Sequence, residues 1–469
     1  MQSWNPVIQN DGEAKFISLT NQLERDIRSG LLEPGTKLPP YRDLAHILGV
    51  SPGTVNKAYA EAKRRGLVDG EVGRGTFIRD LSQPRRAPSE ETATQVDVDQ
   101  YSPTIIDLSI NTPPMLSHNI VLADAFANLS RQNDLEMHSR YLPYFVHAEH
   151  REAAVMWLGH HGLNVAGDEV VLTNGAQHAM AVALSSVATR GDVLYTDTLT
   201  YPGILSLASY MGLEICAVEG DDYGMLPDKL ERAFADQPGK AVYLMPTLHN
   251  PTGHTMPPDR RLNIAKVAQR LGLYILEDDI YGVVGSPNID PLRNLAPDRT
   301  FYLTSMSKAV IPSLRIGFLI PPMHKLADVT ALMRATGWTA APLMMDVGAT
   351  LILDGTAKAL AEQNRDEAYQ RQALTHSVLS AWMTGEPAHC YHLWLKLPEG
   401  WETERFISSA REAGVIITPT EGIRVGTGDP GGVRLCLGAA RNLKVLEIAM
   451  TRLRAVLLGG MRPAFNGLI

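Results

Sequence analysis

The chain has 469 residues, of which 45% are hydrophobic and 20% are charged, and its formal net charge is −8. This apolar content can fill several cores, and at roughly 150 residues per domain the length suggests about three domains. No stretch is long and apolar enough to cross a membrane, and the start lacks the basic and apolar pattern of a signal peptide. The cysteines at positions 216, 390 and 436 lack metal-ligand spacing, so we expect a cytoplasmic protein without a bound metal.

The charge is distributed unevenly along the chain. Residues 1–86 contain 13 Lys and Arg against 10 Asp and Glu, whereas the remainder contains 30 against 41. A positive N-terminal segment on an acidic body is typical of a small DNA-reading head joined to a ligand-binding or catalytic core. A solvated surface of mixed charge explains the excess equally well.

Two short helices are predicted near the N-terminus. The first spans about residues 41–48 and stops at Gly49, and Ser51 caps a second helix that begins at Pro52 and ends before Gly66. Apolar residues recur at helical spacing in the second helix and are expected to face the core. The opposite side, near the helix start that enters the major groove in helix-turn-helix proteins, carries Thr54, Asn56 and Lys57.

A strand at residues 67–69 and a glycine-rich hairpin at residues 70–78 follow. The Pro-Gly-x-x-Leu-Pro lead, the Leu-Ala-x-x-Leu-Gly-Val-Ser turn and the Gly-x-Gly-Thr-Phe hairpin together resemble the GntR-type winged helix-turn-helix, over residues 12–80. The resemblance implies DNA contacts from the two helices and the hairpin, namely Arg42, Ser51, Thr54, Asn56, Lys57, Arg74 and Thr76. The alternative is a helical hairpin that serves only dimerisation.

Residues 81–104 are rich in Ser, Thr, Pro and charge and lack apolar periodicity, which is typical of a linker. Beyond them, residues 105–465 alternate strand-like apolar runs with amphipathic helices. The runs lie at residues 169–174, 192–196, 241–246, 273–278 and 300–305. This pattern predicts an α/β fold with a mainly parallel sheet covered by helices on both faces. Ligands of such sheets bind beyond the carboxyl ends of the strands.

Each predicted strand end carries a group suited to one part of pyridoxal phosphate (PLP). A loop that opens a helix at residues 173–177 can bind a phosphate, and Tyr201 offers an aromatic face to a pyridine ring. Asn250 can donate to a phenolic oxygen, and Asp278 can keep a pyridine nitrogen protonated. Lys308 can form a Schiff base with the aldehyde, beside serine hydroxyls and an arginine that can hold the phosphate.

The order and spacing of these groups resemble fold-type I PLP enzymes of the class I/II aminotransferase group, over about residues 105–460. The resemblance implies an internal aldimine on Lys308, a pyridine contact from Asp278, bonds to the 3-oxygen from Asn250 and Tyr281, and stacking by Tyr201. The implied phosphate ligands are Gly175, Ala176, Gln177, Ser305, Ser307 and Arg315. Tyr141 resembles the tyrosine that reaches the neighbouring subunit's phosphate, so a homodimer is expected.

Two further residues are candidates for binding a small molecule. Arg434, in a Gly-Val-Arg-Leu-Cys-Leu-Gly strand, resembles the arginine that binds a substrate α-carboxylate. Asn111 lies where aminotransferases often have a small residue lining the substrate site, although a plain loop asparagine is as compatible with the sequence.

A GntR head joined through a linker to an aminotransferase-like body resembles the MocR subfamily of bacterial transcription regulators. This implies a PLP-dependent, dimeric regulator that binds a DNA operator and senses a small amine or amino acid through an external aldimine. Because every group needed for amino-group transfer is present, a working aminotransferase with a DNA-binding head is the alternative. A sensor of cofactor supply is a third interpretation. An enzyme has no need of a winged head, so regulation is favoured.

Overall fold

A computed structural model describes residues 4, 6, 15–64, 67–71, 75–79, 105–114, 118–131, 148–285, 289–383 and 386–460. The chain divides into two compact units, Met1–Tyr101 and Ser102–Ile469. The predicted linker at residues 81–104, Arg74 at the hairpin tip and Tyr141 lie outside the described residues.

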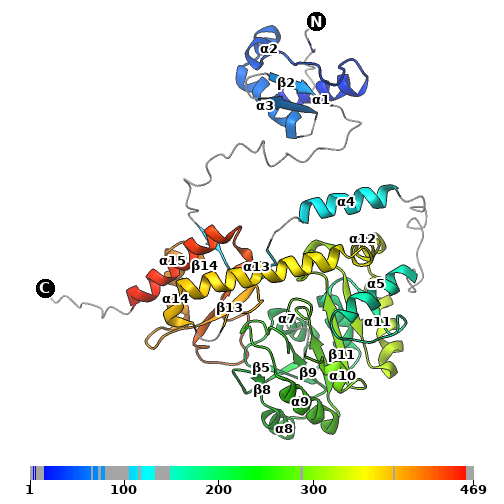
Figure 1. Cartoon of the computed structure of the whole chain (residues 1–469), viewed down its shortest axis with the longest axis vertical. Helices are drawn as coiled ribbons and strands as arrows, with labels where there is room; N and C mark the ends of the chain where they lie inside the picture. Colours follow the sequence, from blue (N-terminus) through cyan, green and yellow to red (C-terminus); the bar gives the residue numbers. More distant parts are fainter. Residues whose placement is uncertain are drawn as a thin grey trace, which may run out of the picture. The chain divides into compact units, whose positions relative to one another are not determined.

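The first unit is a small helical domain with a two-stranded antiparallel hairpin (Figure 1). Its elements are α1 (Lys15–Arg28), α2 (Tyr41–Leu48), α3 (Pro52–Arg64), β1 (Val68–Glu71) and β2 (Gly75–Ile78). Gly49 ends α2 in the left-handed conformation, with φ 60°, where a side chain would be strained. The apolar residues predicted to face the core are buried: Val55, Ala58, Tyr59 and Ala62. The helix-turn-helix prediction is therefore confirmed, with the first hairpin strand one residue later than expected.

A seven-stranded sheet forms the centre of the second unit. Its strand order is β4-β12-β11-β10-β9-β5-β6, and all neighbours pair in parallel except β12, which runs antiparallel to β11 and β4. The strands are β4 (Val171–Thr173), β5 (Val193–Asp197), β6 (Glu214–Val218), β9 (Ala241–Leu244), β10 (Tyr274–Asp278), β11 (Thr300–Ser305) and β12 (Gly317–Ile320). The prediction of a mainly parallel sheet is confirmed.

Helices cover both faces of this sheet. Successive residues of a strand point to opposite sides, so alternate residues pack against helices on different faces. Val193 and Tyr195 of β5 belong to one apolar core, which includes helices α8 and α9, whereas Leu194 between them belongs to the other, which includes α6 and α12. The helices of this part are α5 (Ala148–Gly159), α6 (Ala176–Ser185), α7 (Pro202–Met211), α8 (Pro227–Asp236), α9 (Pro258–Leu271), α10 (Leu292–Leu295), α11 (Leu326–Gly337) and α12 (Pro342–Leu353). A short hairpin, β7 (Gly220–Asp221) and β8 (Gly224–Met225), precedes α8, and α4 (His118–Arg131) packs on α12.

A smaller subdomain combines the C-terminal quarter of the chain, from Thr356 on, with the segment that enters the second unit. The long helix α13 (Thr356–Val378) lies against α15 (Leu443–Gly460), as Figure 1 shows in yellow and red. The remaining elements are α14 (Thr403–Glu412), an antiparallel pair of β13 (His392–Lys396) and β15 (Gly432–Cys436), and a parallel pair of β3 (Ile106–Asp107) and β14 (Val415–Ile416). In the antiparallel pair His392 lies opposite Cys436 and Trp394 opposite Arg434, so these four side chains share one face.

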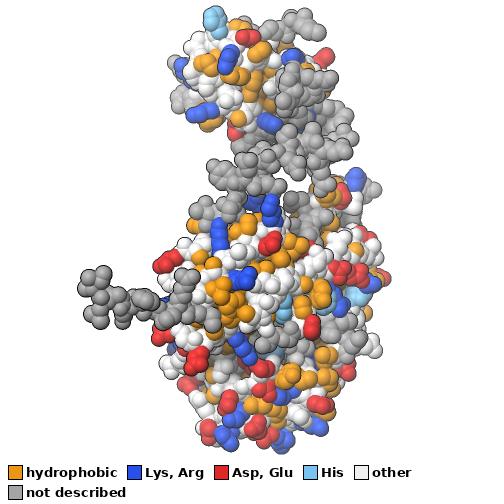
Figure 2. All heavy atoms as spheres, turned by 60° about the vertical axis from the view of Figure 1, so that its left-hand side comes forward, with side chains coloured by type: hydrophobic (Ala, Val, Ile, Leu, Met, Phe, Trp, Pro, Cys, Tyr) orange, Lys and Arg blue, Asp and Glu red, His pale blue; other side chains and the backbone are white. Residues whose placement is uncertain are grey.

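Charged side chains of both signs are interspersed over the visible face of the second unit, and Lys and Arg are scattered among hydrophobic and uncharged residues on the first (Figure 2). Within the described ranges, no helix is long and apolar enough to cross a membrane. Nor does that part of the chain hold a group of three or more His, Cys, Asp or Glu side chains arranged for a metal ion.

Candidate functional site

Lys308 lies in the loop after β11 and is half-buried. Its Nζ donates a hydrogen bond to the backbone oxygen of Asn111, which enters from the start of the second unit. Burial lowers the pKa of Lys308 to about 8, and Arg434 and Arg315 act in the same direction. A substantial fraction of this amine is therefore neutral near physiological pH, as a nucleophilic lysine requires.

Asp278 ends β10 and is buried. Its Oδ2 accepts a hydrogen bond of 2.6 Å from the hydroxyl of Tyr243, while Oδ1 has no partner among the described residues. Burial raises the pKa of Asp278 to about 7. A buried carboxylate oxygen without a donor is costly, so this oxygen is suited to a cationic N–H group that the protein itself does not supply.

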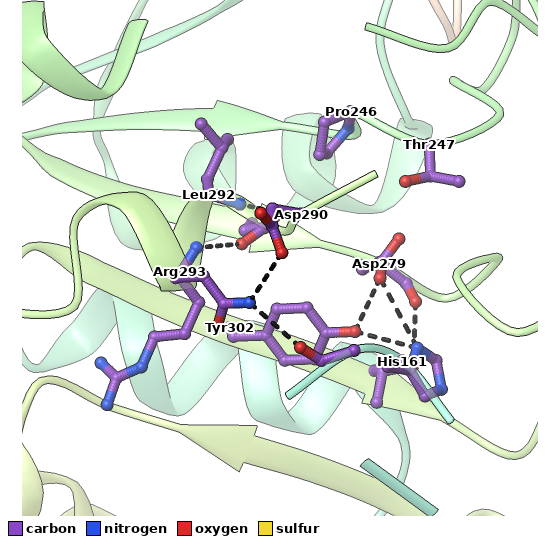
Figure 3. Close-up of polar contacts among 12 residues, drawn as sticks. His161, Pro246, Thr247, Asp279, Asp290, Leu292, Arg293 and Tyr302 are labelled. Carbon is purple, nitrogen blue, oxygen red and sulfur yellow. Dashed lines mark hydrogen bonds and ion pairs between the residues drawn. The ribbon is translucent and has the colours of Figure 1, made fainter. Parts of the chain in front are cut away.

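The neighbouring acids, Glu277 and Asp279, are also buried, and each bonds other parts of the body (Figure 3). Glu277 accepts two 2.8 Å hydrogen bonds from the backbone N–H groups of Leu292 and Arg293, at the start of α10. Asp279 accepts from the Tyr302 hydroxyl at 2.6 Å and lies 3.5 Å from His161. Burial acts to raise the pKa of Asp279, but these two partners outweigh it and hold that pKa below its usual value. The acidic run is therefore not a solvated surface. Oδ1 of Asp279, like Oδ1 of Asp278, has no partner among the described residues, but the other oxygen of Asp279 is held by Tyr302 and lies beside His161.

Asn250 and Arg434 contact each other across the two subdomains. Oδ1 of Asn250 accepts a 2.7 Å hydrogen bond from Nη1 of Arg434, which also donates through Nη2 to the backbone oxygen of Ser109 and to Thr418 Oγ1. Arg434 is 5% exposed, and its Nε has no partner in the part of the chain that is described. The bond to Oδ1 leaves the Nδ2 group of Asn250 to donate elsewhere.

Asn111 and Tyr281 meet on the same side of Lys308. Nδ2 of Asn111 donates to the Tyr281 hydroxyl at 2.8 Å and lies 3.0 Å from Nδ1 of His392. Tyr281 is completely buried, which holds its pKa well above the usual value. Its hydroxyl therefore keeps its proton.

The predicted phosphate ligands lie close to one another around the end of β11 and the start of α6. Gly175 has φ 83°, where a side chain would be strained, and a Cβ at this position would lie 2.6 Å from Nη2 of Arg315, so the Arg315 guanidinium lies directly beside the Gly175 backbone. Ala176 and Gln177 form the first turn of α6, whose N–H groups have no acceptor within the helix. Ser307 Oγ is buried and lacks a partner among the described residues, and Ser305 Oγ accepts from the Ser307 N–H at 3.4 Å.

Tyr201 opens α7 and is half-buried beside the first turn of α6. Its hydroxyl donates to Oε1 of Gln177 at 3.2 Å, and Nε2 of Gln177 donates to the Gly203 backbone oxygen. The Gln177 side chain is thus held by α7, which leaves its backbone N–H as the group available to an anion.

In the head, four of the predicted DNA contacts are exposed on or beside α2 and α3: Arg42, Ser51, Asn56 and Lys57. Ser51 Oγ accepts from the Thr54 N–H at 3.2 Å and caps α3, and Asn56 and Lys57 are exposed on the same helix. The guanidinium of Arg42 lies over the ring of Tyr41, 5.7 Å from its centroid. Thr76 on β2 is only partly exposed.

Sequence reasoning missed two side chains of the site. Tyr243 lies within β9, and its contact with Asp278 on β10 follows from parallel pairing, which a search of strand ends does not sample. His392 comes from the smaller subdomain, 281 residues from Asn111. His392 and His249 also line a cleft of about 830 Å³ between the two subdomains.

Residues 103–453 match the family described as aminotransferase class I and II, and residues 18–78 match the bacterial regulatory proteins of the gntR family. The chain belongs to the class I and II aminotransferase family. The similarity to the archaeal alanine:glyoxylate aminotransferase has a TM-score of 0.70 at 21% identity, covering 76% of this chain and 91% of that one. For LysN, the α-aminoadipate aminotransferase of Thermus thermophilus, the TM-score is 0.69 at 22% identity, with 78% and 95% covered. At these identities the likeness shows the fold.

Relatives that span both parts of the chain are named as regulators. The HTH-type transcriptional regulator YdeF of Bacillus subtilis, described as uncharacterised, is 28% identical over 457 residues, 97% of each chain. The pyridoxine biosynthesis regulator PdxR of Corynebacterium glutamicum is 26% identical, over 80% of this chain and 81% of its own. The predicted layout of a GntR head on an aminotransferase-like body is confirmed, is consistent with the MocR subfamily, and favours a transcription regulator over an enzyme that carries a head.

Proposed function

We propose that the protein is a PLP-dependent transcription regulator whose head binds a DNA operator and whose body responds to a small amine or amino acid. The observation that carries the proposal is the half-buried amine of Lys308, which bonds the backbone oxygen of Asn111, in a chain that also has a GntR-type head. A regulator that reads DNA has to work where the genome is, which supports a cytoplasmic location.

The described residues fit the cofactor because several buried polar atoms lack a partner where PLP has polar groups. Oδ1 of Asp278 suits a protonated ring nitrogen, and Ser307 Oγ with the Gly175–Arg315 contact suits a phosphate. When bound, PLP supplies an aldehyde that condenses with primary amines and a ring that accepts electrons from bonds next to the amine.

Each residue then has a defined task. Lys308 attaches the cofactor, Asp278 holds its ring nitrogen, and Tyr201 covers the ring. Asn250 and Tyr281 donate to the phenolic oxygen, because Asn250 Oδ1 is already taken by Arg434 and the Tyr281 oxygen already accepts from Asn111. The phosphate is held by Gly175, Ala176, Gln177, Ser305, Ser307 and Arg315, and by Tyr141 of the second subunit of a homodimer.

Arg434 is proposed to bind the carboxylate of the effector, with Asn111 beside its amine. A guanidinium that is 5% exposed and retains an unpartnered Nε is well placed for a charge-assisted pair. Because Arg434 also bonds Asn250, carboxylate binding would act on a contact between the two subdomains. Only a ligand that binds two conformations of the body differently can change how the heads bind DNA.

The absorbance of the purified holoprotein, titrated with a panel of amino acids, tests this function. A regulator is expected to show a ligand-dependent spectral change without release of a keto acid. Stoichiometric formation of pyridoxamine phosphate would instead support the aminotransferase alternative, which the complete set of Lys308, Asp278 and Arg434 keeps chemically feasible. Absence of any visible band in the PLP-treated protein would overturn both.

A further inference from the structure

Asn111 links the two sides of the site through a hydrogen-bond chain that begins at a backbone carbonyl. Nε2 of His392 lies 2.9 Å from the backbone oxygen of His249, and Nδ1 of His392 lies 3.0 Å from Nδ2 of Asn111. Nδ2 of Asn111 also lies 2.8 Å from the Tyr281 hydroxyl. All three side chains are buried or half-buried, so water does not compete freely for these bonds.

The donor and the acceptor of each of these hydrogen bonds follow from the first bond, the one to the backbone oxygen of His249. A backbone carbonyl only accepts, so Nε2 of His392 must carry the hydrogen that bonds His249 O. In a neutral imidazole Nδ1 is then an acceptor, which requires the Asn111 amide to present its NH₂ group. The second hydrogen of that group points at Tyr281, whose oxygen accepts it. The proton of Tyr281 is consequently left for a different acceptor.

The surroundings keep His392 neutral. Burial lowers the pKa of His392 to about 3, although its bond to His249 acts in the opposite direction, and the positive charges of Arg434 and Lys308 lower it further. The other ionisable groups around the ring include the thiols of Cys390, 3.4 Å from Nδ1, and Cys436, which lies opposite His392 in the strand pair. The Tyr281 ring lies 5.6 Å from the His392 ring, and burial holds the pKa of the nearby His249 imidazole well below its usual value, so His249 is neutral. Burial raises the pKa of both thiols, so both stay protonated.

We propose that His392 is a positioning residue that, through Asn111, fixes Tyr281 as a hydrogen-bond donor toward the cofactor's phenolic oxygen. This inference rests on the PLP binding proposed above. Without His392 the Asn111 amide is free to rotate, and Tyr281 can donate to Oδ1 of Asn111, which has no partner among the described residues. The phenolic oxygen then loses a donor that stabilises its anionic form.

The test has two measurements. In the holoprotein, His392→Phe is expected to raise the pH midpoint of the visible absorbance change by about 1 unit. The reason is that loss of the Tyr281 donor disfavours the deprotonated form of the lysine-bound cofactor. His392→Asn places an acceptor near the position of Nδ1 and is expected to restore most of the wild-type midpoint. His254→Gln, which removes a half-buried imidazole stacked on His249 and outside these hydrogen bonds, should leave the midpoint unchanged.

Nitrogen NMR of histidine-labelled protein without cofactor gives the second measurement and does not depend on how the variants fold. A neutral His392 ring protonated on Nε2 across pH 6–8 is expected. Protonation on Nδ1, an imidazolium signal, or a His392→Phe midpoint equal to that of the wild type would overturn the proposal. If the wild-type holoprotein has no visible band, the proposed function fails, while the NMR result still decides the hydrogen-bond chain.

Discussion

The head and the body place their candidate functional residues in opposite environments. In the head, Arg42, Asn56 and Lys57 are exposed, so they can meet a large partner without any change in the domain core. In the body, Asp278 and Tyr281 are buried and Lys308 is half-buried, and the pKa values of all three are shifted by burial. Substitutions in the body are therefore expected to give large, chemically specific losses, whereas substitutions in the head should give graded losses of affinity.

Replacement of Lys308 is expected to have the largest effect. Lys308→Ala removes the amine that attaches the cofactor, so the visible band and the adduct trapped by borohydride should both disappear. Absorbance and mass spectrometry after reduction measure this. Lys396→Ala, which removes an exposed lysine paired with Asp222, is the matched control and should retain both signals. A reducible adduct in Lys308→Ala would show that another lysine holds the cofactor.

Replacement of Arg434 is expected to have the second largest effect, because Arg434 is the proposed carboxylate ligand of the effector and also bonds Asn250. Arg434→Ala should keep the cofactor and basal DNA binding, while the effector concentration for half-maximal response rises roughly 10- to 100-fold, the cost of a lost charge-assisted bond. The measurement is the DNA affinity of this variant, with and without the amino compound that the spectral screen identifies. An unchanged response would mean that the ligand has no carboxylate or that another cation binds it.

Cofactor uptake should depend on pH because Lys308 reacts as the neutral amine. Burial places its pKa near 8, so the rate of covalent attachment to the apoprotein should rise about tenfold per pH unit below pH 8 and level off above it. Stopped-flow absorbance between pH 6 and 10 measures the profile. A rate that still climbs at pH 10 would show that Lys308 has an ordinary lysine pKa.

The two regions also differ in how much the sequence alone could predict. The head's helix ends follow from adjacent residues, such as Ser51 with Pro52 and Leu48 with Gly49, and the predicted bounds of its two helices were nearly those observed. In the body, the groups at strand ends were predictable because parallel strands present their carboxyl ends at one edge. The contacts of Tyr243 with Asp278 and of His392 with Asn111 join distant segments, and no local pattern signals them.

The smallest effect is expected in the head, where single contacts are exposed and screened by salt. Arg42→Ala should weaken operator binding only several-fold and reduce the slope of log affinity against log salt by about 1, as loss of one phosphate contact predicts. Arg25→Ala removes the same charge from α1, where Arg25 is bonded to Gln22, and should leave the slope unchanged. Titrations at several salt concentrations separate the two variants. Equal slopes would mean that Arg42 contributes only to the overall electrostatic field of the domain. The exposed groups of α3 would then have to supply the contacts to DNA.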